Sequence, residues 1–185
     1  MSTIRALAAT EGSATATLPN LPLPRPDAAI YSELRALSAC DAIRHEWADL
    51  ASRALEANPC LEPGFALAAA QHLISYRDAE LMLLWQGDPS SERRHLVGLV
   101  PCRTRRHIFA ADTLEGFADP RLLNGTPLLD STFAAPALAA FLRDWRRCGH
   151  ASDAFSLSGI DPAGAFAATL ARVADGQGVA VGWQP

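Results

Sequence analysis

The sequence predicts a mixed α/β domain, an α+β arrangement with a mainly antiparallel sheet of about six to seven strands and helices on both faces. Two observations predict it: four segments carry apolar residues at helical spacing, and short apolar runs bounded by glycine, proline or asparagine lie between them. The chain has 185 residues, enough for one domain whose core needs neither disulfides nor metal.

The N-terminal segment differs in composition from the rest of the chain. Residues 1–27 are rich in Ala, Thr, Ser and Pro, and Pro22, Pro24 and Pro26 alternate. Alternating prolines block both helices and sheet ladders. We therefore expect a disordered tail over residues 1–27 and a folded domain over residues 28–185.

The first half of the domain predicts a strand, two helices and a β-hairpin. Weak alternation over residues 29–37 indicates the strand. The first helix would start at a capping box, Ser38 to Asp41, and end before Pro59. Pro63 suits the first turn of the second helix. Residues 79–85 and 94–102 are apolar runs on either side of a turn cluster, which is typical of two paired strands.

The second half predicts alternating strands and helices. Strands are expected at residues 107–117, 154–160 and 179–183. One helix would be capped by Ser131 or Thr132 and end at Gly149; another would follow Asp161 and end at Gly176. We expect these two helices to be crossovers that pair strands in parallel.

Composition excludes several classes of function. The net charge is −4, with 16 arginines and no lysine, so no basic surface for nucleic acid is expected. No apolar run is long enough to span a membrane. The cysteines, at positions 40, 60, 102 and 148, form no C-x-x-C pair, and no secretory signal precedes them, so we expect reduced thiols, a cytoplasmic location and no metal site.

The predicted order, β-α-α-β-β-β-α-β-α-β, is similar to that of the GNAT-type N-acyltransferase fold. Two stretches resemble the cellulose-biosynthesis-type acetyltransferases: residues 47–65, with Trp-Ala-Asp-Leu, Asn-Pro and Glu-Pro-Gly-Phe, and residues 96–130, with Leu-Val-Gly-Leu-Val-Pro and Gly-Thr-Pro-Leu-Leu-Asp. The resemblance covers roughly residues 40–183. It implies that this chain is the first of two acyltransferase-type units, the second of which holds acyl-CoA.

The resemblance also implies acetyl-CoA as the cofactor, a small-molecule or sugar-linked amine as the acceptor, and a link to exopolysaccharide production. The CoA pyrophosphate would lie at the N-terminus of the helix after the central strand, where free N–H groups favour an anion. Ser131 and Thr132 occupy that place. The segment has no glycine and begins with Asp130, whose carboxylate is a poor neighbour for pyrophosphate.

Acyl transfer to an amine needs a base, and five side chains are candidates: Glu62, His72, His95, His107 and Asp130. His95 opens a strand, where we expect it to be solvated, and Asp130 is most simply a helix cap. Glu62 precedes Pro63 and is either a base or a helix cap. His72 lies beside an apolar stripe and is either a base or a half-buried structural histidine. His107 follows Arg105 and Arg106, in either a surface turn or an anion-binding corner.

Polar residues interrupt an apolar segment at Asn124-Gly125-Thr126-Pro127. They form either a turn or bulge, or the rim of a substrate cleft with Asn124, Thr126 and the following Asp130 directed at a polar ligand. Two functions remain open: an N-acyltransferase or its N-terminal substrate-side unit, with a second acyltransferase-type domain or a second copy as partner, and a non-catalytic binding or assembly module that has lost CoA.

Overall fold

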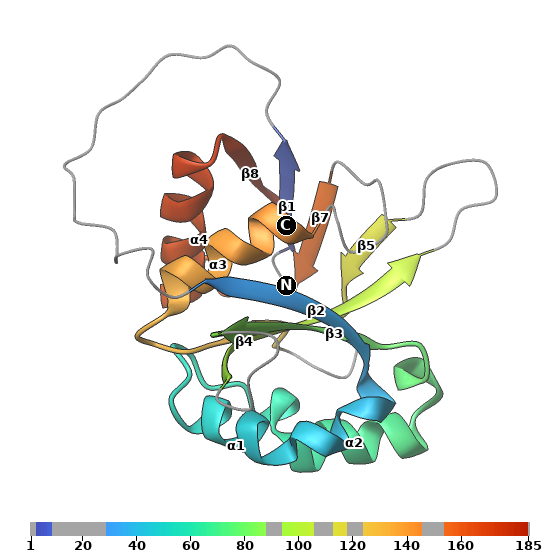
Figure 1. Ribbon diagram of the computed structural model, residues 1–185. Coiled ribbons are helices and arrows are strands. Elements are labelled where there is room, and N and C mark those ends of the chain that lie inside the picture. Colours follow the sequence, from blue (N-terminus) through green and yellow to red (C-terminus); the bar gives the residue numbers. More distant parts are fainter. Residues whose placement is uncertain are drawn as a thin grey trace.

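The computed structural model describes residues 3–8, 29–87, 94–105, 113–117, 124–145 and 154–184. This part of the chain forms two antiparallel sheets covered by helices (Figure 1). The strands are β1 (Thr3–Ala8), β2 (Ile30–Ala36), β3 (Glu80–Gln86), β4 (His95–Arg105), β5 (Thr113–Gly116), β6 (Leu128–Leu129), β7 (Ala154–Ser158) and β8 (Val179–Gln184). The helices are α1 (Arg44–Ser52), α2 (Pro63–His72), α3 (Ala134–Asp144) and α4 (Ala165–Gly176), with 3-10 turns η1 (Leu37–Ile43), η2 (Pro59–Leu61) and η3 (Ile74–Tyr76).

The larger sheet has the strand order β2-β3-β4-β5, and β6 also pairs with β4. All of its ladders are antiparallel. The long strand β4 pairs with β6 near Gly98 and with β5 from Cys102 onward, so two separate segments occupy successive parts of one edge. The predicted mixed α/β class with a mainly antiparallel sheet is confirmed, but the strands are divided between two sheets.

The smaller sheet corrects two predictions. Its order is β7-β1-β8, with β1 between the other two strands. A tail without structure is therefore wrong for residues 3–8, because they form the middle strand. Parallel pairing across the helices is also wrong. Both β7 and β8 are antiparallel to β1, so they run in the same direction without being neighbours.

Two hydrophobic cores lie on opposite faces of the larger sheet. Alternate side chains of β3 point to opposite faces: Met82 and Leu84 belong to one core, and Leu83 and Trp85 to the other. The first core includes Phe141 of α3 and residues of α4; the second includes Trp47 of α1 and residues of α2. Figure 1 shows the two pairs of helices on opposite sides of β2, β3 and β4. Helices on both faces are thus confirmed. Each fully buried large side chain contributes roughly 1.5–3 kcal/mol.

Several predicted helix ends differ from the structure. The Ser38–Asp41 capping box is wrong, because the chain is in η1 there and α1 begins at Arg44. Side-chain caps from Ser131, Thr132 and Asp161 are also wrong: α3 and α4 have Phe133 and Gly164 as N-cap residues, with no side-chain cap bond. The predicted end of the third helix at Gly149 lies outside the described residues.

Within the described ranges, no helix combines the length and the apolar composition needed to cross a membrane.

Candidate functional site

The segment of residues 53–60, between α1 and η2, joins several parts of the molecule, and we call it the connecting segment. Ala54 forms an isolated β-bridge with Asp130, and the Leu55 N–H donates to the Leu129 carbonyl at 2.6 Å. Side chains of the same segment reach β4, the start of α4 and residues 124–126. The two sequence stretches that resemble the acetyltransferases therefore contact each other.

Arg53 and Asp130 form an ion pair at the start of α3. Asp130 is almost fully buried, with 4% of its side chain exposed, and 23% of Arg53 is exposed. The guanidinium group also donates to the Leu96 carbonyl at 2.8 Å and pairs with Asp49 at 2.9 Å. Asp49, Asp130 and the Leu96 carbonyl thus accept hydrogen bonds from a positively charged guanidinium group. Such hydrogen bonds are stronger than those between neutral groups.

The backbone ahead of α3 is already hydrogen-bonded within the protein. The Thr132 N–H donates to Asp130 Oδ1 at 2.7 Å, and the Ser131 N–H donates to the Arg53 carbonyl at 3.1 Å. The Ser131 and Thr132 side chains are exposed. At the place predicted for a cofactor pyrophosphate, a carboxylate of the chain itself takes the position of the anion.

A second carboxylate occupies the start of α4. Glu56 Oε1 accepts the Phe166 N–H at 2.6 Å. A Cβ atom added to Gly164 would lie 2.6 Å from the same oxygen, so glycine is what allows Glu56 to approach the helix. The negative charge is favourable there, because the first N–H groups of a helix carry a partial positive charge. Glu56 therefore performs the capping that the sequence assigned to Asp161.

Asn58 fixes residues 124–126. Its buried side chain donates to the Thr126 carbonyl at 2.7 Å and to the Asn124 carbonyl at 3.3 Å, and it accepts the Cys60 N–H at 3.1 Å. The Asn124 Oδ1 atom accepts the Thr126 N–H at 2.9 Å. Residues 124–126 therefore hold a defined loop conformation without a ligand.

The same loop joins the two sheets. The Gly125 N–H donates to the Gly159 carbonyl at 3.0 Å, and a Cβ atom on Gly125 would lie 1.9 Å from the Ser158 carbonyl oxygen. A Cβ atom on Gly116 of β5 would lie 2.6 Å from the Ser156 carbonyl oxygen of β7. The backbones of the two sheets therefore approach each other closely at these two glycines.

A cavity of about 20 Å³, which is room for about one water molecule, lies beneath the larger sheet on the side of α2. Apolar side chains make up most of its wall, and Cys60, Glu80 and Asn124 also border it. Because side chains alternate along β3, the Glu80 side chain lies on the same face as Met82, opposite Leu81, which lines the cavity. On that face Glu80 Oε2 accepts a hydrogen bond from the Thr104 hydroxyl at 2.8 Å, which fixes the carboxylate.

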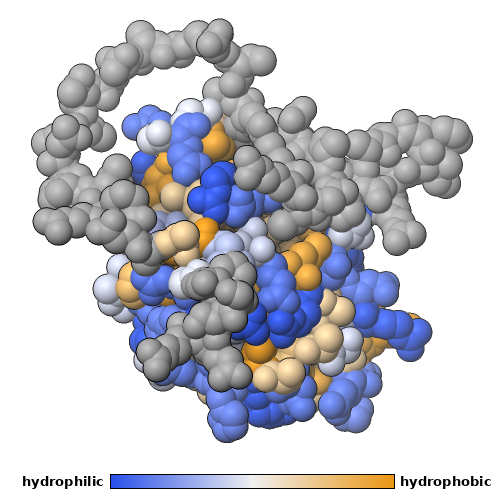
Figure 2. Space-filling model, in the orientation of Figure 1, coloured by the Kyte–Doolittle hydropathy of each residue, from blue (hydrophilic) through white to orange (hydrophobic). Residues whose placement is uncertain are grey.

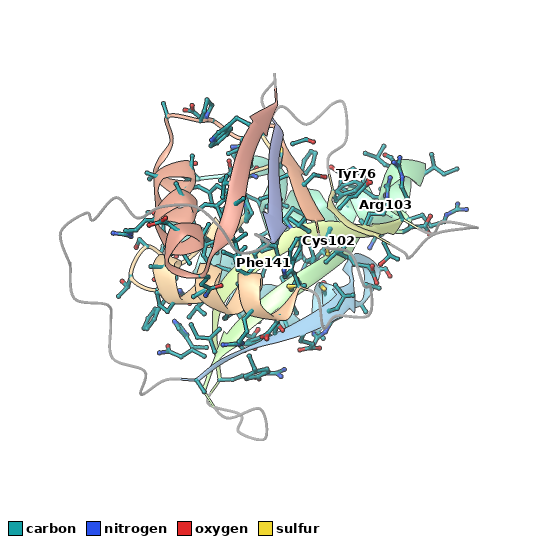
Figure 3. The ribbon with its side chains drawn as sticks, turned by 90° about the horizontal axis from the view of Figure 1, so that it is seen from above. Tyr76, Cys102, Arg103 and Phe141 are labelled. Carbon is teal, nitrogen blue, oxygen red and sulfur yellow. The ribbon has the colours of Figure 1, made fainter. Side chains whose placement is uncertain are left out.

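An aromatic and cationic cluster flanks this cavity. The Tyr76 and Phe117 rings meet edge to face with centroids 4.7 Å apart, and both residues line the cavity. The Arg103 guanidinium lies 4.9 Å from the centre of the Phe117 ring and donates to the Ser75 carbonyl. Figure 3 shows Tyr76 and Arg103 beside each other at the end of the sheet, next to Cys102. This packing closes one end of the cavity.

The candidate bases do not meet in one place. Glu62 is exposed at the start of α2 without a side-chain cap bond, and His72 is exposed in the last turn of the same helix. Glu62 is therefore the N-cap residue by its backbone position but forms no side-chain cap, and the alternative of a half-buried His72 is wrong. Neither residue lines the cavity, whereas Asn124 does; Thr126 is buried away from it. His107 lies outside the described residues.

Four residues of this region had no sequence signal: Arg53, Glu56, Asn58 and Glu80. Each works through a partner distant in the chain, such as Asp130 for Arg53 and Phe166 for Glu56. Asn58 was interpreted as the end of a helix because proline follows it, although its side chain makes three hydrogen bonds. The available clue was that asparagine is seldom buried without a hydrogen-bonding role, but burial itself cannot be predicted from the local sequence pattern.

In the described part of the chain, no group of three His, Cys, Asp or Glu side chains is arranged to hold a metal ion.

Comparison with known proteins gives no further assignment: no family model, no curated protein and no solved structure matches the chain. Function must therefore be argued from the geometry.

Proposed function

We propose that this chain is an acyltransferase-type unit that serves the substrate side of an acyl-CoA-dependent N-acyltransferase and does not hold acetyl-CoA itself. The order of elements supports the lineage, since β2, two helices, β3, β4, β5, α3, β7, α4 and β8 follow one another as the resemblance implies, with β1 and β6 as strands that the expected order lacks.

One observation carries the second half of the proposal: Asp130, locked to Arg53, occupies the anion position at the start of α3. A pyrophosphate at this place would meet a buried carboxylate and would have to displace an ion pair. Desolvated like charges at short distance are strongly unfavourable. Glu56 blocks the start of α4 in the same way.

The Glu80 carboxylate is the proposed site for the acceptor amine. It is half-buried at the start of β3, on the face opposite the cavity, and the Thr104 hydroxyl fixes it with a hydrogen bond of 2.8 Å. A protonated amine suits a carboxylate that is held in place in this way. Glu80 would hold the ammonium group and orient it; the acyl-CoA would come from a second acyltransferase-type unit. Free thiols at Cys40, Cys60 and Cys102 support a cytoplasmic setting.

Ligand-induced thermal stabilisation tests the cofactor part. Unaltered protein is expected to show no shift with millimolar acetyl-CoA, whereas a ligand at 100 times its Kd adds about 2.7 kcal/mol. Asp130→Asn keeps an oxygen for the Thr132 N–H and leaves Arg53 with the exposed Asp49 as its remaining carboxylate partner, so this variant should gain a shift. Adding Arg53→Met to it should remove that gain. A shift with the unaltered protein, or none with Asp130→Asn, would contradict the proposal.

A second measurement separates the substrate-side unit from the alternative, a non-catalytic assembly module. Amines such as glucosamine and spermidine should stabilise the unaltered protein and not Glu80→Gln, which keeps the size of the side chain and loses its charge. Glu62→Gln, at an exposed position outside the cavity, is the matched control. If no amine stabilises the protein, the substrate-side role is refuted and the assembly module is the better assignment.

A further inference from the structure

The strand β8 forms one edge of the three-stranded sheet. It pairs with β1 along one side, from Val179 opposite Ala8 to Gln184 opposite Thr3. On its other side, no segment within the described ranges hydrogen-bonds to it. An edge strand presents a row of N–H and C=O groups that a further strand can pair with.

The composition of β8 does nothing to prevent such pairing. Val179–Gln184 contains no charged residue and no proline, the two devices that most often protect an edge. The side chains of Ala180 and Gly182 are small and exposed, and Trp183 is 41% exposed although it is a large aromatic residue. As far as the described residues extend, the edge is therefore uncharged and uncovered.

The edge strand β2 of the larger sheet is built differently. Glu33 and Arg35 form an ion pair on it at 2.5 Å. Arg143 from α3 donates to the Ile30 carbonyl at 2.9 Å, so part of this edge is already bonded by a neighbouring helix. This contrast indicates that the edge of β8 can pair with a further strand, whereas the ion pair and the Arg143 hydrogen bond hinder such pairing at β2.

We propose that β8 pairs with β8 of a second copy of this chain, antiparallel about a twofold axis at Val181, giving a continuous six-stranded sheet. In that register Val179 faces Trp183 of the second copy, and Ala180 faces its Gly182. Aromatic residues opposite β-branched ones are among the favourable cross-strand pairs, and small residues opposite small ones allow close approach. No like charges face each other.

Self-complementarity selects a second copy over a strand of another protein. The same patch serves both partners, as a closed twofold dimer requires. The pairing also covers part of Trp183 with Val179, which accounts for an aromatic residue left exposed at the edge of the sheet. This inference is independent of the proposed function, since neither Glu80 nor the start of α3 takes part in it.

Sedimentation velocity of the full chain at micromolar concentration tests the pairing. The unaltered protein should sediment as a dimer. Replacing both Ala180 and Gly182 by lysine places like charges opposite each other and should weaken the dimer roughly tenfold or more. The control Ala36→Lys puts the same charge at an exposed position of β2 and should leave the dimer unchanged. Circular dichroism confirms that each variant is folded.

Cross-linking tests the register. Opposed residues in an antiparallel pair have Cα atoms about 4.5–5.5 Å apart, which suits a disulfide. In a background with Cys60 and Cys148 replaced by serine, a mixture of Ala180→Cys and Gly182→Cys proteins should form a cross-linked dimer on mild oxidation, and neither variant alone should. A monomeric unaltered protein, a dimer that survives both lysines, or a dimer lost in the Ala36→Lys control would each overturn the inference.

Discussion

The ion pair between Arg53 and Asp130 gives a quantitative test of how the connecting segment is held. Asp130→Ala leaves the guanidinium without its buried partner and removes the acceptor of the Thr132 N–H. Breaking a buried pair costs about 3–5 kcal/mol. Because 23% of Arg53 is exposed and Asp49 remains within 2.9 Å, we expect the lower end, about 3 kcal/mol.

Urea unfolding followed by tryptophan fluorescence measures this loss of free energy. In a separate thermal unfolding experiment, the melting temperature should fall by roughly 6–12 °C. Arg53→Ala and the double variant complete a thermodynamic cycle, with an expected coupling of about 1–3 kcal/mol. The control is Arg44→Ala, which removes a pair whose side chains are 49% and 69% exposed and should cost less than about 1 kcal/mol. A loss below about 1 kcal/mol for Asp130→Ala, or no coupling, would refute the argument that this pair anchors the segment.

Four further outcomes follow from the same geometry. Gly125→Ala should cost several kcal/mol in a melting experiment, because its Cβ would lie 1.9 Å from the Ser158 carbonyl oxygen, whereas Gly64→Ala, with nothing within 4 Å, should be close to neutral. Burial raises the pKa of the Cys40 thiol to about 11, from 9.0, so Cys40 should react with a disulfide reagent at pH 8 far more slowly than the half-buried Cys60. The same raised pKa makes the protein lose stability as the pH rises from about 9 to about 11, since the unfolded thiol ionises first; pH-dependent urea unfolding of Cys40→Ser, which should lack this loss, checks the sign. Removal of residues 1–9 should abolish the protection of β7 and β8 in hydrogen exchange, and a synthetic peptide of those residues should restore it; protection that survives the removal would show that β1 is dispensable.

The parts of the fold that could be predicted depend on local pattern. β3 is apolar on both faces and belongs to both cores, and its continuous run of Leu, Met and Trp indicates a buried strand without further context. Pro63 fixes the start of α2, and Gly178, with φ at 65°, adopts the left-handed conformation that prevents α4 from continuing. These features arise within a few residues of one another.

The parts that were missed depend on distant partners. Thr3–Ala8 is a weakly patterned segment that becomes a strand because β7 and β8 bond to both of its edges. Glu56 caps α4 although more than a hundred residues separate it from Phe166. The sequence does indicate that Asp130 belongs at the start of α3 and disfavours a phosphate there; it contains no sign of Arg53, because nothing local pairs those positions.

The order of β7, β1 and β8 has a consequence for how this protein is made. Residue 8 pairs with residue 179, so β1 is synthesised well before the strand β8 with which it pairs. Contacts at such sequence separation form slowly, and an unpaired strand is exposed in the meantime. The larger sheet, whose strands β2 to β6 lie close together in the chain, can assemble during synthesis, while the smaller one is completed afterwards. Expression conditions that slow aggregation of the nascent chain should therefore raise the yield of native protein more than conditions that favour helix formation.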